Sequence, residues 1–151
     1  MKFTTDSPEE TIALGREIGQ HLQAGDIIAF EGSLAAGKTT LTKGIAEALG
    51  IKETITSPTF TLISEYNGRL PLYHMDVYRL NSAEDFIEIG GEELLYGGGV
   101  CIIEWSEKIK ETLPDSAITI SIKSTGADSR LIDISNWNIN PFSATFITEN
   151  L

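Results

Sequence analysis

Residues 32–39 read Gly-Ser-Leu-Ala-Ala-Gly-Lys-Thr, which matches every fixed position of the phosphate-loop pattern G-x-x-x-x-G-K-[ST]. An apolar run at residues 27–30 precedes the loop and a helix-like pattern begins near Lys38. Gly32 and Gly37 allow successive backbone amides to converge on one point, and the start of the helix adds the positive end of its dipole. The stretch therefore predicts a strand, a polyphosphate-binding loop and a helix.

The loop also predicts roles for its side chains. Lys38 is expected to reach the β- and γ-phosphates of a nucleotide, and the Thr39 hydroxyl is expected to complete the coordination shell of a bound Mg²⁺ ion. The predicted nucleotide-binding residues of this region are Gly32, Ser33, Leu34, Ala35, Ala36, Gly37, Lys38, Thr39 and Thr40.

The composition is typical of one globular domain. The 151 residues are 41% hydrophobic and 22% charged, and a chain of this length buries roughly 70% of its unfolded surface. The only cysteine, Cys101, lies in an apolar run and is expected to be buried. No apolar stretch approaches the ~20 residues of a membrane span and the N-terminus lacks a signal-peptide pattern, so a cytoplasmic protein without membrane contact is expected.

The net charge of −11, from 11 basic and 22 acidic residues, restricts the partners. A polyanion is repelled unless the few basic side chains gather on one face, so independent nucleic-acid binding is disfavoured. The charge is consistent with a protein partner that carries basic groups, and equally with simple solubility.

Helix and strand patterns alternate along the chain. Ser7, Pro8 and Glu10 predict the start of a helix that ends at Gly25, and Asn67-Gly68 predicts a hairpin turn. Further helices are expected at 38–49, 82–89 and 106–113, and strands at 27–30, 59–66, 70–75, 100–103, 117–123 and 130–134.

These elements predict an α/β fold, a P-loop NTPase-like three-layer sandwich with a mixed parallel/antiparallel sheet. The domain is expected to span residues 1–135. Residues 136–151 have little periodicity and are expected to form a loosely held C-terminal extension, although Trp137, Phe142 and Phe146 offer apolar groups that could dock on the body.

Two acids follow predicted core strands. Asp76 comes directly after residues 72–75, and Glu104 directly after residues 100–103. Because α/β sheets bind their ligands at the carboxyl ends of strands, both side chains are candidates for the acid that a nucleotide hydrolase aims at its metal ion.

Three further residues are candidates near the nucleotide. Thr59, in Ser57-Pro58-Thr59-Phe60, occupies the place of a switch threonine, although a proline turn entering a strand explains the same pattern. Arg130, on the last hairpin, is a candidate for covering the nucleotide. His74 is flanked by Tyr73 and Met75 on a strand, which favours a structural or hydrogen-bonding histidine over a general base.

Four segments together resemble the TsaE family, the bacterial ATPase of tRNA threonylcarbamoyladenosine synthesis. They lie at residues 32–40, 57–60, 74–80 and 104–105, and the third reads His-Met-Asp-Val-Tyr-Arg-Leu. Their order and spacing match the family from about residue 4 to about residue 135. The third segment followed by Glu104-Trp105 is more specific than the phosphate loop alone.

The resemblance implies a small ATPase that binds ATP and Mg²⁺ and is weak alone. With the proteins TsaB and TsaD it would support repeated transfer of a threonylcarbamoyl group onto adenosine 37 of tRNA, which it would contact only indirectly through the complex. The resemblance also implies site roles: phosphate and metal binding for Lys38 and Thr39, a switch-like loop for Thr59, an essential acid for Asp76, a magnesium-side carboxylate for Glu104, and a place beside the nucleotide pocket for Trp105.

The chain departs from the family pattern at three positions. Ser33 and Ala35 replace an acid and a glycine of the common family loop, at variable positions of the general motif, so phosphate binding is expected to survive in a stiffer or weaker loop. Ser106 replaces a proline after Glu104-Trp105 and is expected to cap the next helix.

Other functions use the same loop. A small-molecule kinase needs an acceptor pocket and usually an arginine-rich lid, and only Arg69 and Arg79 fall in the middle of the chain. A nucleotide-gated protein-binding module with negligible hydrolysis would order residues 57–60 for a partner, and it stays open. A GTPase is disfavoured because the chain has no Asn-Lys-x-Asp segment.

Overall fold

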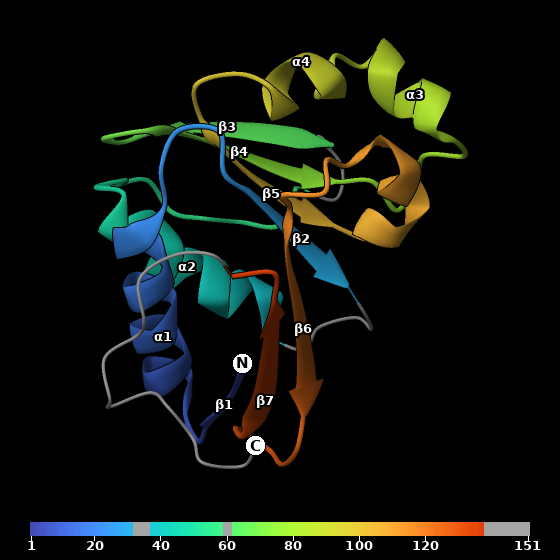
Figure 1. The fold of residues 1–151 in the computed structure, drawn as a ribbon. Coiled ribbons are helices and arrows are strands. Elements are labelled where there is room, and N and C mark those ends of the chain that lie inside the picture. Colours follow the sequence, from blue (N-terminus) through green and yellow to red (C-terminus); the bar gives the residue numbers. More distant parts are fainter. Residues whose placement is uncertain (32–36, 59–61, 138–151) are drawn as a thin grey trace.

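A mixed β-sheet organises the chain (Figure 1). The computed structural model describes residues 1–31, 37–58 and 62–137, and this part contains a seven-stranded sheet in the order β1-β7-β6-β2-β5-β4-β3. The strands β6, β2, β5 and β4 are parallel to their neighbours in that run, and the outer pairs are antiparallel. The bounds are β1 Lys2–Thr5, β2 Ile27–Glu31, β3 Ile63–Asn67, β4 Pro71–Asp76, β5 Val100–Glu104, β6 Ile118–Ser124 and β7 Arg130–Ser135. The mixed sheet is as predicted.

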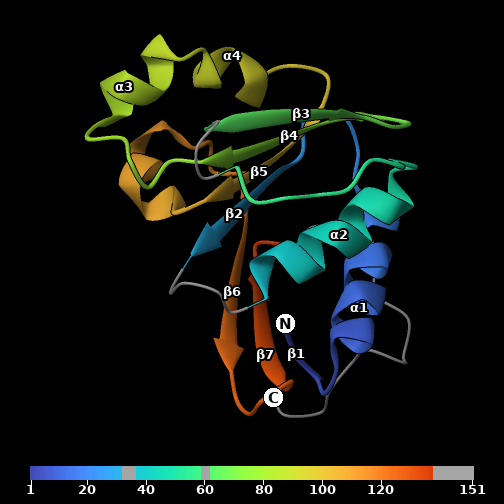
Figure 2. The same cartoon turned by 180° about the vertical axis from the view of Figure 1, so that it is seen from behind.

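Helices cover both faces of this sheet. The helices α1 (Pro8–His21) and α2 (Lys38–Ala48) pack on one face. The short helices α3 (Ala83–Glu88) and α4 (Gly91–Leu95) lie on the other face beside β3 and β4, with the 3₁₀ helix η1 (Ser106–Thr112) following β5 (Figures 1 and 2). The predicted three-layer sandwich is therefore confirmed, with its second helical layer over the β3-β4-β5 side.

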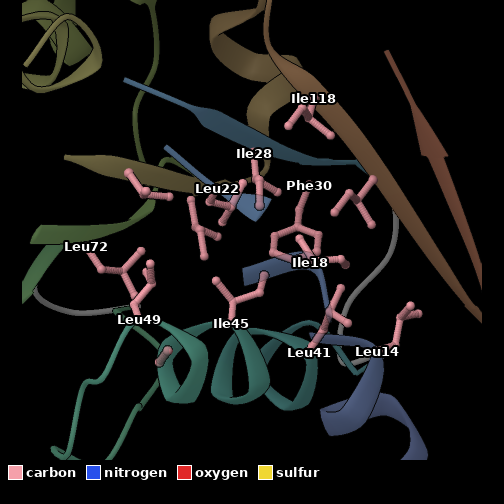
Figure 3. Packing of buried hydrophobic residues seen from close by; sticks show 14 of the residues in the cluster. Leu14, Ile18, Leu22, Ile28, Phe30, Leu41, Ile45, Leu49, Leu72 and Ile118 are labelled. Atoms are coloured by element: carbon pink, nitrogen blue, oxygen red, sulfur yellow. The ribbon is translucent and has the colours of Figure 1, made fainter. Parts of the chain in front are cut away.

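Two hydrophobic clusters fill the spaces between the layers. Leu14 and Ile18 of α1 and Leu41 and Ile45 of α2 meet Phe30 of β2 in the first cluster (Figure 3). The second cluster joins the opposite face of the sheet to α3, α4 and η1, through Met75, Phe86, Leu95, Ile103 and Ile109. The central strands β2 and β5 face both clusters, which explains their continuous apolar sequences. The strand β2 leads into the phosphate-loop residues, and β5 ends at Glu104.

The first helix begins as predicted and ends earlier. The Ser7 hydroxyl accepts a hydrogen bond from the Glu10 N–H at 3.1 Å, which satisfies one of the free amides of the first turn. The helix ends at His21 rather than at Gly25. The Asp26 carboxylate accepts the Gln23 N–H at 2.7 Å, so a side-chain-capped turn replaces the last predicted helical turn.

The hairpin between β3 and β4 is present, but its turn differs from the predicted two-residue turn. Asn67 pairs with Pro71, which leaves three residues between the strands. Gly68 does not have a positive φ, unlike four other described glycines. A Cβ on Gly68 would lie 2.1 Å from the Leu49 carbonyl oxygen, so this glycine permits close approach to the end of α2.

Sequence patterns did not predict β1 or α4. The four residues of β1 pair with β7 from the far end of the chain, with Phe3 opposite Ile132. In the five-residue helix α4 only Gly91 and Leu95 are buried. Both elements are too short to carry a recognisable period.

The helices α1 and α2 touch through glycines. A Cβ on Gly15 would lie 2.3 Å from the Leu41 carbonyl oxygen, and a Cβ on Gly44 would lie 2.1 Å from the Ile12 carbonyl oxygen. Neither contact is relieved by rotating a side chain, because the clash involves the Cβ itself and backbone atoms. The glycines thus set the separation of the two helices and the position of the α2 N-terminus.

Replacing Gly44 with alanine is expected to destabilise the fold by about 1–3 kcal/mol, because overpacking outweighs the gain in helix propensity of roughly 1 kcal/mol. Urea unfolding measures the change. Gly98→Ala is the matched control, since nothing lies within 4 Å of a Cβ at that position. An unchanged midpoint for Gly44→Ala would show that the helices separate without cost.

Candidate functional site

The predicted site residues gather where the parallel strands end. The strand β2 leads into residues 32–36, β4 ends at Asp76 and β5 ends at Glu104. Asp76 and Glu104 are register partners on adjacent parallel strands. Lys38, the first residue of α2, is 4% exposed, Asp76 6% and Glu104 8%. One cation and two acids are therefore buried at the carboxyl edge of the sheet, where charged groups need partners or a ligand.

The start of α2 provides the part of the phosphate loop that the structure describes. Gly37 precedes the helix with φ +98°, a left-handed conformation that favours glycine. Lys38, Thr39 and Thr40 form the first turn, where backbone N–H groups and the helix dipole favour an anion. The predicted residues Gly32, Ser33, Leu34, Ala35 and Ala36 lie outside the described residues.

Lys38 packs against an aromatic column. Its Nζ lies 5.1 Å from the ring centroid of Trp105, within the range of a cation–π contact. The Trp105 ring lies 4.8 Å from that of Tyr78, and Lys108 Nζ lies 4.8 Å from the Tyr78 ring on the exposed side. The column connects the buried lysine to the surface.

Glu104 is held by a histidine on the neighbouring strand. His74 Nε2 and Glu104 Oε2 are 2.7 Å apart. The side chain of His74 is fully buried and that of Glu104 is 10% exposed. The predicted hydrogen-bonding role of His74 is therefore confirmed.

Asp76 is tied to its own strand end and to the segment before β3. Its Oδ1 accepts the Tyr78 N–H at 2.9 Å, and its N–H donates to the Leu62 carbonyl at 2.9 Å. The Leu62 N–H in turn donates to the Pro58 carbonyl at 2.9 Å. The predicted switch residue Thr59 lies outside the described residues, but its flanks at Pro58 and Leu62 are linked to Asp76.

Two residues at this edge adopt left-handed backbone conformations without being glycine. Leu62 has φ +66° and Trp105 has φ +63°. Such conformations are costly for bulky side chains and concentrate at functional sites. The strain adjoins both acids, because Leu62 bonds to Asp76 and Trp105 follows Glu104.

Ser106 does not cap the helix after Trp105, contrary to expectation. Trp105 itself occupies the N-cap position of η1, and the buried Ser106 hydroxyl donates to the Phe30 carbonyl at 2.9 Å. The hydroxyl therefore ties the start of η1 to β2 instead of satisfying the first helical turn.

Arg130 lies beside Gly37. Its Nε lies 3.4 Å from the position that a Cβ on Gly37 would take. Its Nη1 donates to the Ser129 carbonyl at 2.8 Å and to the Gly126 carbonyl at 3.3 Å. A small pocket of about 30 Å³ separates α1 from this hairpin, lined by Pro8, Thr11, Gly37, Thr40, Asp128 and Arg130. The geometry brings Arg130 to the described end of the loop.

The donor set suits a magnesium ion that arrives with a nucleotide. The described residues contain no group of three or more His, Cys, Asp or Glu side chains able to hold a metal ion. Mg²⁺ is usually bound by one or two carboxylates together with substrate phosphates and water. The hydroxyl of Thr39 and the carboxylate of Glu104 are oxygen donors of this kind, so the residues present fit such an ion.

Cys101 is separate from the site. It is buried in β5, and burial raises the pKa of its thiol to about 12. Its Sγ donates to the Leu94 carbonyl at 3.3 Å. The predicted buried cysteine is confirmed, and its thiol is unreactive in this environment.

None of the helices in the described part of the chain is long and apolar enough to cross a bilayer.

The sequence is similar to known proteins along most of its length. Residues 5–132 match the family model TsaE, described as threonylcarbamoyl adenosine biosynthesis protein TsaE. A protein of Treponema pallidum (strain Nichols) named tRNA threonylcarbamoyladenosine biosynthesis protein TsaE is 48% identical, over 89% of this chain and 99% of the relative. A protein of the same name from Bacillus subtilis (strain 168) is 48% identical, over 87% of this chain and 83% of the relative.

A solved structure agrees in fold. The crystal structure of Bacillus subtilis YdiB superposes with a TM-score of 0.72 at 46% identity, covering 87% of this chain and 82% of that one.

Proposed function

The chain belongs to the TsaE family of threonylcarbamoyl adenosine biosynthesis proteins, and from this premise we propose that it is an ATP-binding and ATP-hydrolysing component of tRNA modification. Its hydrolysis supports turnover of the TsaB–TsaD threonylcarbamoyl transferase acting on adenosine 37. The ATPase is weak alone, depends on these partner proteins, and meets tRNA only through their complex in the cytoplasm.

One observation carries the proposal. A lysine at the start of the loop-bearing helix and two carboxylates at the ends of neighbouring parallel strands are all at most 8% exposed. An ATPase site needs a cation for the phosphates and acids for the metal and the attacking water, in a place that limits solvent. Lys38, Asp76 and Glu104 supply this combination.

Each site residue has its own role in binding the nucleotide, holding the metal ion or orienting the water. Lys38 and the first turn of α2 bind the β- and γ-phosphates, and Arg130 and Trp105 border the nucleotide. Thr39 and Glu104 would hold Mg²⁺, which when bound neutralises charge on the phosphate oxygens. Asp76 accepts a hydrogen bond from the water that attacks the γ-phosphate and orients it.

A second candidate is a nucleotide-gated protein-binding module. The observation that favours it is the link from Pro58 through Leu62 to Asp76, since Leu62 has a left-handed backbone. In this module, a γ-phosphate bound by Thr59 would change the hydrogen bonds that join Pro58, Leu62 and Asp76. Residues 57–60 would then be ordered for a partner protein without hydrolysis.

Phosphate release from Mg-ATP distinguishes the two. We expect slow release by the purified protein, faster release with TsaB and TsaD together, and loss of release in Glu104→Ala under both conditions. Glu107→Ala is the matched control, because Glu107 is an exposed acid three residues further along the chain. It is expected to release phosphate at the rate of the unaltered protein.

Tight ATP binding without release, alone or with both partners, would favour the binding module. Absence of nucleotide binding would contradict both candidates.

A further inference from the structure

His74 is fully buried although only one of its two ring nitrogens has a hydrogen-bond partner among the described residues. Its side chain is 0% exposed, and its only hydrogen bond within the described part of the chain is the 2.7 Å contact to Glu104 Oε2. Its Nδ1 is buried and has no hydrogen-bond partner among the described residues. Burial with one ring nitrogen unpaired is unfavourable compared with an apolar side chain of similar size. Stability of the core therefore does not explain a histidine at this position.

The unpaired nitrogen indicates which tautomer is present. A carboxylate only accepts hydrogen bonds, so Nε2 carries the hydrogen and donates it to Glu104. A hydrogen on Nδ1 would be buried without an acceptor, which is more costly than a buried lone pair. The ring thus makes one polar contact with the described residues, the donation from Nε2–H to Glu104.

The strand register places this donor at the site edge. His74 and Asp76 are two residues apart on β4 and point to the same face of the sheet. Ile102, two residues before Glu104, is the register partner of His74. The histidine therefore reaches Glu104 from two register pairs deeper in the sheet. The bond uses one carboxylate oxygen and leaves the lone pairs of the other for a ligand.

We infer that His74 is a positioning residue: its Nε2–H orients the Glu104 carboxylate toward the magnesium ion of the bound nucleotide. The inference rests on the proposed function, since it assumes that the nucleotide binds with Mg²⁺. His74 does not touch the nucleotide or the metal ion. Its loss leaves the phosphate contacts of Lys38 intact and lets the Glu104 side chain take other rotamers.

The test compares binding of the non-hydrolysable β,γ-imido analogue of ATP with Mg²⁺ and with EDTA, by titration calorimetry. In the unaltered protein Mg²⁺ is expected to strengthen binding. In His74→Leu this strengthening should fall by about 10-fold or more, the usual effect of removing a partner of a metal ligand, with unchanged affinity in EDTA. His74→Gln, whose amide nitrogen can replace Nε2–H, should restore it.

A double variant isolates the path through Glu104. In a Glu104→Gln background, His74→Leu should have no further effect on the Mg²⁺ dependence, because the group that it positions is already altered. If His74→Leu does not fold, His74→Asn replaces it, since the shorter amide does not reach Glu104.

Other outcomes contradict the inference. Equal weakening with Mg²⁺ and with EDTA would indicate a general structural role, and full Mg²⁺ dependence in His74→Leu would show that Glu104 needs no positioning. Both results would leave the proposed ATPase standing. Binding by the unaltered protein that ignores Mg²⁺ would overturn the inference together with the metal role in the proposed function.

Discussion

Replacing Lys38 with alanine is expected to weaken ATP binding by about 3 kcal/mol, on the order of 100-fold in Kd. The ammonium group is the buried cation at the start of α2, and alanine leaves the β- and γ-phosphates without this charge. Charge-assisted hydrogen bonds are worth more than neutral ones because the partners are ionised. Titration calorimetry with Mg-ATP measures the change.

Lys43→Ala is the matched control for this variant. Lys43 lies on the same helix and is exposed, so its removal changes the net charge equally without touching the site. We expect its Kd to stay within about 2-fold of the unaltered value, as for most exposed substitutions. Equal weakening in both variants would mean that the affinity comes from the overall charge of the protein rather than from Lys38.

Trp105 provides a second readout of the same event. Lys38 Nζ lies 5.1 Å from the Trp105 ring, so we expect binding of phosphate to draw the ammonium toward the anion. The environment of the indole then changes, whereas in Lys38→Ala it is altered before nucleotide is added. Tyr78 and Lys108 continue the column from Trp105 to the surface.

The fold was predictable wherever local sequence determines structure. The apolar run and the phosphate-loop motif at residues 27–39 predicted β2 and the start of α2, and the apolar run before Glu104 predicted β5. The strand β1 was not predictable, because a strand of four residues exists only through pairing with β7. The role of Gly68 was predicted wrongly for a related reason: this glycine permits close approach to Leu49, which is distant in the sequence.

The candidate site was likewise predictable from the sequence only in part. Lys38, Asp76 and Glu104 were identified because strand ends and a loop motif are visible in sequence, and the register of β4 and β5 then brings the two acids together. The His74–Glu104 bond, the left-handed Leu62 and the contact between the Tyr78 and Trp105 rings depend on that register and on how the chain leaves each strand. Such relations between strands have no signature in a single sequence.

Replacing Asp76 with asparagine is expected to slow phosphate release by about 100-fold or more while leaving the Kd for Mg-ATP nearly unchanged. The substitution keeps an oxygen that can accept the Tyr78 N–H, now bonded to Oδ1 at 2.9 Å, so the turn after β4 is preserved. It removes the charge that, in the proposed function, orients the attacking water. A carboxylate used only with that water contributes to the transition state and little to nucleotide binding.

Single-turnover phosphate release and calorimetry on the same preparation separate these two effects. Asp115→Asn is the control, because it removes one exposed acid outside the site; Asp76→Ala adds loss of the Tyr78 bond. If Asp76→Asn weakens binding as much as it slows release, Asp76 belongs with Lys38 among the binding groups. If only Asp76→Ala is slow, the turn matters and the charge does not, and Glu104 becomes the acid that acts on the water.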